Sequence, residues 1–273
     1  MPRFYGLLEV SPDGNYLAVG GEEGTYILDG NMQIKKIIGC PELNGQHKKT
    51  RFADDSRFIL VGGAFDVIIY DMFDTVERPI TVITFPRKYG GLSDFRMIDH
   101  KLFIIFGEQL IVYKIMSFFP FIKHEVEKLN EKVYWCADGY QYLYFKGDTI
   151  AVTNILTNHI KMVNFSYPIL KHTLTCYGGL FAYFTDDKNC AIADLSESPG
   201  SILARLTGHT FNLRFTRYGN VIINMIEGVF VYNLASKKTE TLKEGMPSIM
   251  SIEEFNGRFV ALSPEYKIVI IEP

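Results

Sequence analysis

The chain has 273 residues, of which 47% are hydrophobic, 14% aromatic and 22% charged, a globular balance with ample material for a buried core. Its formal net charge of −3 argues against a protein whose main task is to coat nucleic acid or an anionic membrane. No stretch approaches about 18 uninterrupted apolar residues, so no membrane span is expected, and the N-terminal residues do not show the pattern of a secretion signal.

The four cysteines are scattered along the chain, at Cys40, Cys136, Cys176 and Cys190. They form no CxxC pair and no cysteine–histidine cluster at the spacing of a zinc site. Scattered cysteines without a secretion signal are typical of reduced thiols. We therefore expect an intracellular protein, located in the cytoplasm, the nucleus or both.

The first element in chain order is a hairpin in residues 10–29, VSPDGNYLAVGGEEGTYILD. Two short apolar runs, YLAVG and TYILD, are separated by the tight turn GEEG and preceded by Asp13-Gly14, a pair that favours a turn. The units repeat about every 40 residues and together fill the chain. The first unit ends at Asp29, and the six that follow end in VIIYD, LIVYK, IAVTN, CAIAD, VFVYN and IVIIE, at Asp71, Lys114, Asn154, Asp194, Asn233 and Glu272.

Each unit has the same internal order of elements. An alternating apolar segment is followed by a turn rich in Asp, Asn and Gly, a second apolar run, a polar tight turn and a third run. Most units continue with a fourth, more polar strand, such as MQIKKIIG or KTETLKEG. Four short antiparallel strands in a period of about 40 residues are typical of a β-propeller blade. The sequence therefore predicts an all-β, seven-bladed β-propeller that forms a single domain over residues 1–273.

The units resemble WD repeats over essentially the whole chain. SPDGNYLAVGGEEGTYILD and ADDSRFILVGGAFDVIIYD match the repeat pattern, and LTGH at 206–209 is similar to the Gly-His that opens such a repeat. The Trp of the Trp-Asp pair is absent from all seven units, and the single Trp135 lies in the expected first strand of the fourth unit. The resemblance implies that the buried His–Asp network of the family is mostly missing and that these blades rely on apolar packing.

The seventh unit consists of SIMSIEEF, RFVALS and KIVIIEP and has no fourth strand. Either blades one and seven close the ring by apolar packing, or a partner adds a strand to KIVIIE by β-augmentation. In the first case the third strand is an edge protected by charge and proline, at Lys267, Glu272 and Pro273. WD-repeat subunits of vesicle coats and nuclear-pore scaffolds are similar in leaving a blade to be completed by another chain. The candidate partner-binding residues of this edge are Lys267, Val269 and Ile271.

Sequence signatures of catalysis are missing. The chain has no GxSxG, HExxH, P-loop or GxGxxG motif, and its six histidines are scattered over different units. The first strands, which would line the central channel of a propeller, are mainly apolar, and their charged residues are Glu9, Arg51, Arg96, Arg214 and Glu253. We predict a protein that is not an enzyme and has no catalytic residues, no cofactor and no metal site.

Two further segments are candidate partner-binding sites. The basic segment QHKKTR (46–51) is either a solvated loop or a contact for phosphate or RNA, and its basic residues are Lys48, Lys49 and Arg51. The segment SFFPF (117–121) either packs in the core or forms an exposed aromatic patch for a partner, and its aromatic residues are Phe118, Phe119 and Phe121.

The sequence as a whole predicts a non-catalytic scaffold or adaptor subunit that mediates protein–protein interactions in a larger intracellular complex. Rigid blades hold many loops at fixed positions, so partners can be bound without chemistry. Other protein subunits are the expected partners, in a hetero-complex rather than a homo-oligomer. The alternative is a propeller that binds RNA or anionic phospholipid headgroups through the basic loop at 46–51.

Overall fold

A computed structural model describes most of the chain, and the described residues form 27 strands in seven antiparallel sheets. In each sheet, strands that follow one another in sequence are also neighbours in space, so every sheet is a simple meander. We number the sheets 1 to 7 in chain order and call their strands first, second, third and outer. The described residues are 3–39, 49–76, 78–85, 87, 91–106, 109–114, 122–128, 133–147, 149–165, 169, 174–186, 189–196, 199–208, 210–244, 249 and 251–271.

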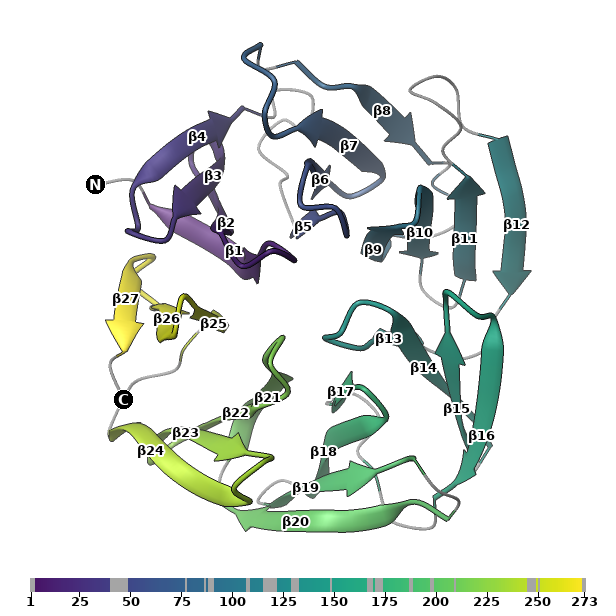
Figure 1. Ribbon diagram of the computed structural model, residues 1–273, viewed down its shortest axis with the longest axis vertical. Coiled ribbons are helices and arrows are strands. Elements are labelled where there is room, and N and C mark those ends of the chain that lie inside the picture. The colour runs from purple at the N-terminus through teal and green to yellow at the C-terminus, as the bar shows by residue number, and fades with distance from the viewer. Residues whose placement is uncertain are drawn as a thin grey trace. The chain divides into compact units, whose positions relative to one another are not determined.

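The chain divides into two compact units, and the first comprises Met1–Asn130 and Met250–Ile270. It holds sheets 1, 2, 3 and 7 (Figure 1). Sheet 1 contains β1 (Phe4–Val10), β2 (Tyr16–Gly21), β3 (Gly24–Asp29) and β4 (Ile34–Ile38). Sheet 2 contains β5 (Lys49–Phe52), β6 (Phe58–Gly62), β7 (Asp66–Asp71) and β8 (Thr81–Thr84). Sheet 3 contains β9 (Leu92–Ile98), β10 (Lys101–Phe106), β11 (Gln109–Lys114) and β12 (Ile122–Lys128), and sheet 7 contains β25 (Ser251–Phe255), β26 (Arg258–Leu262) and β27 (Ile268–Ile271).

The second unit comprises Glu131–Ile249 and Ile271–Pro273, and it holds sheets 4, 5 and 6. Sheet 4 contains β13 (Val133–Trp135), β14 (Gln141–Lys146), β15 (Thr149–Asn154) and β16 (His159–Asn164). Sheet 5 contains β17 (Leu174–Tyr177), β18 (Leu180–Asp186), β19 (Asn189–Asp194) and β20 (Ser201–Thr207). Sheet 6 contains β21 (Thr210–Phe215), β22 (Val221–Met225), β23 (Gly228–Asn233) and β24 (Lys238–Glu244). The expectation of a single domain over residues 1–273 stays a prediction.

The turns of the sequence repeat are the turns of the sheets. In sheet 1 the first turn is closed by the Gly14 N–H, which donates to the Ser11 carbonyl at 2.8 Å, and Gly14 has a φ of 78°. In sheet 4 the Gly139 N–H donates to the Cys136 carbonyl at 3.0 Å, and Gly139 has a φ of 79°. Positive φ is accessible to glycine at little cost, which explains why the Asp-Gly pairs fall there.

The core lies between successive sheets. Third strands such as β3, β7 and β19 are almost fully buried, while the outer strand β20 alternates between exposed and half-buried residues. β-Branched and aromatic side chains fit such pleated surfaces, which is why the short apolar runs form strands. One apolar cluster lies between sheets 2 and 3, and its largest fully buried side chains are Phe95 and Phe106. A matching cluster between sheets 4 and 5 contains Phe181 and Tyr183.

Sheets 1 and 7 pack against each other within the first unit. Leu8, Leu17 and Leu28 of sheet 1 form one buried cluster with Phe255 and Leu262 of sheet 7. Two hydrogen bonds accompany this contact, from the Leu8 N–H to Ser251 Oγ at 3.0 Å and from the Phe4 N–H to the Tyr266 carbonyl at 3.0 Å. Sheets 1 and 7 therefore pack through apolar side chains, and in the described residues sheet 7 has three strands. The addition of a partner strand to this sheet stays a prediction.

Candidate functional site

The outer edge of sheet 7 differs from the edges of the other sheets. No strand of the described residues pairs with the outer edge of β27, whereas the third strand of each other sheet is covered by an outer strand. β27 reads Ile-Val-Ile-Ile, while the strands that end the other sheets carry Lys, Arg, Glu, His or Thr. An aliphatic strand with a free edge is a template for pairing with another chain.

The candidate residues of this edge lie in or beside β27. Lys267 is exposed and precedes the strand, in a turn closed by the Ser263 N–H, which donates to the Lys267 carbonyl at 2.9 Å. Val269 is half-buried and Ile271 is buried, while Ile270 is 38% exposed. Ile268 packs against the apolar cluster shared by sheets 1 and 7. The role of these residues in partner binding stays a prediction.

A group of buried and half-buried charged residues lies on the first strands of sheets 1, 2 and 3. The Arg51 guanidinium of β5 donates to Glu9 of β1 (NH1 to Oε2, 2.6 Å) and to both carboxylate oxygens of Asp94 on β9, each at 3.3 Å. Arg96 of β9 donates from NH1 to the other oxygen of Glu9, Oε1, at 2.7 Å. Lys49 Nζ lies 3.2 Å from Asp94 Oδ2. We call these five residues, from three consecutive sheets, the ionic network.

The pKa values of the ionic network follow from burial and from the neighbouring charges. Burial alone would raise the pKa of Asp94, but the positive charges of Arg51, Lys49 and Arg96 outweigh it and hold that pKa well below its ordinary value. Burial alone would lower the pKa of Arg51, but Asp94 and Glu9 raise it. Burial lowers the pKa of Lys49, and the attraction of Asp94 only partly compensates. Arg51 and Asp94 therefore hold each other in their charged forms despite their burial.

The ionic network uses two residues of the predicted basic segment. Lys49 and Arg51 direct their charges to Asp94 and Glu9, and Lys49 Nζ also donates to the Ser93 carbonyl at 2.8 Å. Lys48 lies outside the described residues, as do Phe118, Phe119 and Phe121. Binding of RNA or phospholipid headgroups by the segment at 46–51 stays a prediction, and nothing in this geometry favours it.

Part of the ionic network is predictable from the sequence. Glu9, Arg51 and Arg96 are charged residues of the predicted first strands, and the structure joins all three. The participation of Asp94 and the contact between Lys49 and Asp94 are not among the predictions. A signal was present, because Lys49 and Arg51, like Asp94 and Arg96, are two residues apart and so share one face of a strand.

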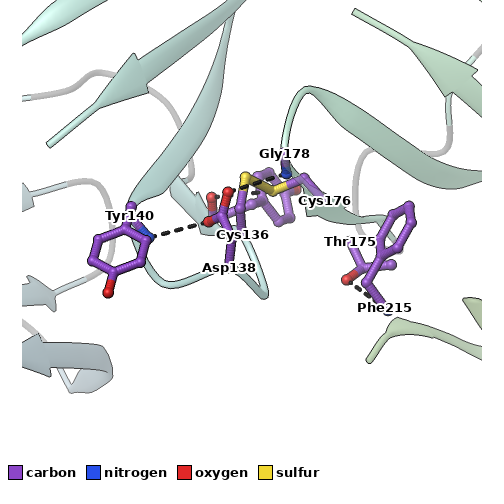
Figure 2. The surroundings of a disulfide bond; sticks show 8 residues. Cys136, Asp138, Tyr140, Thr175, Cys176, Gly178 and Phe215 are labelled. Carbon is purple, nitrogen blue, oxygen red and sulfur yellow. Dashed lines mark hydrogen bonds between the residues drawn. A yellow bond between two sulfur atoms is a disulfide. The ribbon is translucent and has the colours of Figure 1, made fainter. Parts of the chain in front are cut away.

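A disulfide between Cys136 and Cys176 links the ends of the first strands of sheets 4 and 5. Figure 2 shows the bond and the hydrogen bonds beside it, in which Asp138 accepts from the N–H groups of Tyr140 and Gly178, each at 3.1 Å. The Ala137 N–H also donates to the Cys176 carbonyl at 2.7 Å. The expectation of reduced thiols is wrong for this pair. The two cysteines are 40 residues apart, one repeat, which places them at equivalent positions in neighbouring sheets.

Comparison with known proteins identifies the fold. No family model and no curated protein sequence matches the chain. Among solved structures, the Swd1 β-propeller domain of Myceliophteria thermophila is similar with a TM-score of 0.69 and 14% identity, over 99% of this chain and 96% of that one. Hsv2 of Kluyveromyces lactis gives a TM-score of 0.69 and 14% identity, over 97% and 91% of the two chains. The chain is a seven-bladed β-propeller.

The similarity shows the fold and leaves the activity open. A chain of hydrazine synthase from Kuenenia stuttgartiensis is also similar, with a TM-score of 0.67 and 11% identity, over 100% of this propeller and 96% of that chain. The resemblance of the units to WD repeats stays a prediction, because it rests on the repeat pattern alone. In the described part of the propeller, no helix has the length and apolar character needed to cross a membrane.

Proposed function

We propose that this propeller is a non-catalytic scaffold or adaptor, and that a partner protein adds a strand to the outer edge of β27. The observation that carries the proposal is the contrast between sheet 7 and the six four-stranded sheets of the described residues. Third strands of this composition are covered by an outer strand in every other sheet, so β27 presents an edge that the fold elsewhere covers.

Strand addition matches the chemistry of this edge. An added strand gains main-chain hydrogen bonds along β27, and alternate side chains find apolar pockets on the sheet faces. The aliphatic side chain of Ile270 is 38% exposed and would be covered by such a strand. Leu8, Phe255 and Leu262 are already buried together without an added strand. In the described residues, the outer edge of β27 is open to a partner strand.

A role in assembly rather than catalysis agrees with the use of the charged residues. In the ionic network the two carboxylates, Glu9 and Asp94, are each engaged by two cations, at distances from 2.6 to 3.3 Å. Their negative charges are compensated by cations of neighbouring first strands, and these ion pairs link three sheets. The proposal therefore assigns the binding role to the rim of the protein at β27.

The test compares the full-length propeller with a variant whose edge is blocked. Ile270→Lys places a charge on β27, and Val82→Lys is the matched control, since Val82 is 43% exposed on the outer strand of the complete sheet 2. Tagged proteins are used for co-purification from the source cells. The proposal predicts a partner that is retained by the wild type and the Val82→Lys variant and lost with Ile270→Lys.

The second stage shows where that partner binds. In the purified complex, amide hydrogen exchange of residues 268–271 should slow relative to the isolated propeller, because their outward N–H groups become hydrogen-bonded. A partner that binds equally well to the Ile270→Lys variant, or that leaves exchange in β27 unchanged, would overturn the proposal.

A further inference from the structure

Four of the six four-stranded sheets share a feature in their outer strands, whereas the equivalent residues of β12 and β24 are Glu127 and Lys243. In sheets 1, 2, 4 and 5 the residue opposite the second position of the third strand is a branched aliphatic one. These side chains are buried or half-buried, and each packs in the cluster shared with the following sheet. The pairs are Ile38 with Thr25, Ile83 with Val67, Val163 with Ile150, and Leu206 with Cys190.

Two outer strands carry a lysine two residues before this aliphatic residue. Lys36 of β4 lies opposite Ile27, and Lys161 of β16 lies opposite Val152, the fourth position of the third strand in both sheets. Lys36 Nζ donates to the carbonyls of Asp71, Met72 and Asp74, at 3.3, 3.2 and 2.7 Å. These carbonyls belong to the turn that follows the third strand of sheet 2.

The same contact recurs between sheets 4 and 5. Lys161 Nζ donates to the carbonyl of Ser196, in the turn after the third strand of sheet 5. Both receiving turns begin with an aspartate whose Oδ1 accepts a backbone N–H two residues on, at 2.9 Å for Asp71 and 2.6 Å for Asp194. In both pairs of sheets, backbone carbonyls of the turn accept from a lysine of the preceding sheet.

Sheet 7 offers the same surroundings without the outer strand. By the repeat, Glu272 is equivalent to Asp29, so Ile268 holds the second position of its third strand and Ile270 the fourth. Ile268 packs against the cluster shared with sheet 1. The following turn is that of sheet 1, where Asp29 Oδ1 accepts from the Asn31 N–H at 2.9 Å. This turn lies beside sheet 7, because Asn256 Nδ2 donates to the Gly30 carbonyl at 3.3 Å.

We propose that the partner segment is an antiparallel strand with the pattern Lys-X-Ile or Lys-X-Val. Its aliphatic residue lies opposite Ile268, over the cluster shared by sheets 1 and 7. Its lysine lies opposite Ile270 and reaches the carbonyls and the Asp29 carboxylate of the turn in sheet 1. The proposal rests on strand addition at β27 and specifies the chemistry of the strand that is added.

The probe is a labelled peptide of residues 157–165, TNHIKMVNF, which carries Lys161 and Val163 in the required pattern. Its binding to the full-length propeller is measured by fluorescence anisotropy. We expect binding that is lost for the peptide with Val163→Asp and weakened about fivefold for the peptide with Lys161→Glu, the loss expected for one partly exposed charge contact. The Ile270→Lys propeller should not bind the peptide, and the Val82→Lys propeller should bind it like the wild type.

A covalent fusion of the peptide to the propeller allows the pattern to be tested even if the free peptide binds weakly. The same nine residues are joined to Pro273 by a short Gly-Ser linker, which raises their effective concentration at β27 to about the millimolar range. The fusion with the parent peptide should have a higher melting temperature than the fusions with Val163→Asp or Lys161→Glu.

The outcomes distinguish the proposed Lys-X-Ile or Lys-X-Val pattern from strand addition at β27 itself. If all the peptides bind or stabilise equally, or if none does, the pattern is wrong, and strand addition is then judged by the partner that depends on Ile270. If the partner that co-purifies with the wild type binds the Ile270→Lys variant equally well, strand addition is wrong as well. If the isolated propeller forms dimers that Ile270→Lys dissociates, the occupant of the edge is a second copy of the chain and the proposed partner is wrong.

Discussion

The two compact units join the first strands of their sheets by different chemistry at related places. In the first unit, Asp54 N–H donates to the Met97 carbonyl at 3.1 Å, and Ala53 and Met97 pack in the same apolar cluster. In the second unit, Ala137 N–H donates to the Cys176 carbonyl at 2.7 Å, and Cys136 and Cys176 form a disulfide. The interface between sheets 2 and 3 is thus held by an apolar contact beside the ionic network. The equivalent interface between sheets 4 and 5 is held by a disulfide bond.

One repeat geometry therefore accepts several kinds of link between neighbouring sheets. An ionic network depends on pH, because its carboxylates must stay ionised, whereas a disulfide depends on the redox conditions. The two units should therefore respond to different perturbations.

Removing the central carboxylate of the ionic network should have the largest effect. Glu9→Ala leaves the buried Arg51 and the half-buried Arg96 without their shared acceptor, and we expect a loss of about 3–5 kcal/mol in the free energy of unfolding. Urea denaturation of the full-length protein measures it, with the exposed Glu22→Ala as control. A loss as small as that of the control would mean that the network contributes little.

Opening the disulfide should have the next largest effect. The double variant Cys136→Ala, Cys176→Ala should lose about 2–4 kcal/mol, because the unfolded chain is no longer cross-linked between residues 40 positions apart. A reducing agent should lower the stability of the wild type by a similar amount and leave the double variant unchanged. If the reductant destabilises both proteins equally, its effect does not come from this bond.

Acid should remove the contribution of ionised Asp94 to the stability of the fold. The pKa of Asp94 lies below its ordinary value of 3.8, so ionised Asp94 stabilises the fold above that pH, and this contribution is lost as the pH falls below it. Asp94→Asn should lower the free energy of unfolding by about 1–3 kcal/mol at pH 7. The difference from the wild type should shrink toward pH 3 in urea titrations. A difference that stays constant across this range would contradict the assignment.

The smallest expected effect tests the lysine of an outer strand. Lys36→Met removes the hydrogen bonds to the turn of sheet 2 and should lower the free energy of unfolding by about 1 kcal/mol. The neighbouring Lys35→Met removes only an exposed ion pair with Asp29 and should change stability by less than about 0.5 kcal/mol. Equal losses for the two variants would remove the basis for a lysine in the partner strand.

Much of the fold was predictable because it is encoded locally. Turn pairs such as Asp13-Gly14 and the apolar runs between them mark the hairpins of the sheets. The links between sheets were harder to predict, since they depend on which side chains meet across separate hairpins. Asp94 reaches Arg51 only because β5 and β9 lie side by side.

The disulfide was missed for a related reason. Cysteine motifs that bind metals or form local redox pairs have their residues close in sequence, and Cys136 and Cys176 match none of them. In a repeat protein the relevant distance is the repeat itself, which brings equivalent positions of neighbouring sheets together. The separation of 40 residues between Cys136 and Cys176 is that distance.

The most direct test of strand addition is amide hydrogen exchange at residues 268–271 in the purified complex with the Ile270-dependent partner. Our account predicts that exchange there slows by at least about tenfold on binding, as expected for newly formed strand hydrogen bonds, while the exposed edge of β8 is unchanged. Unchanged exchange in β27 in the presence of a saturating, bound partner would contradict it.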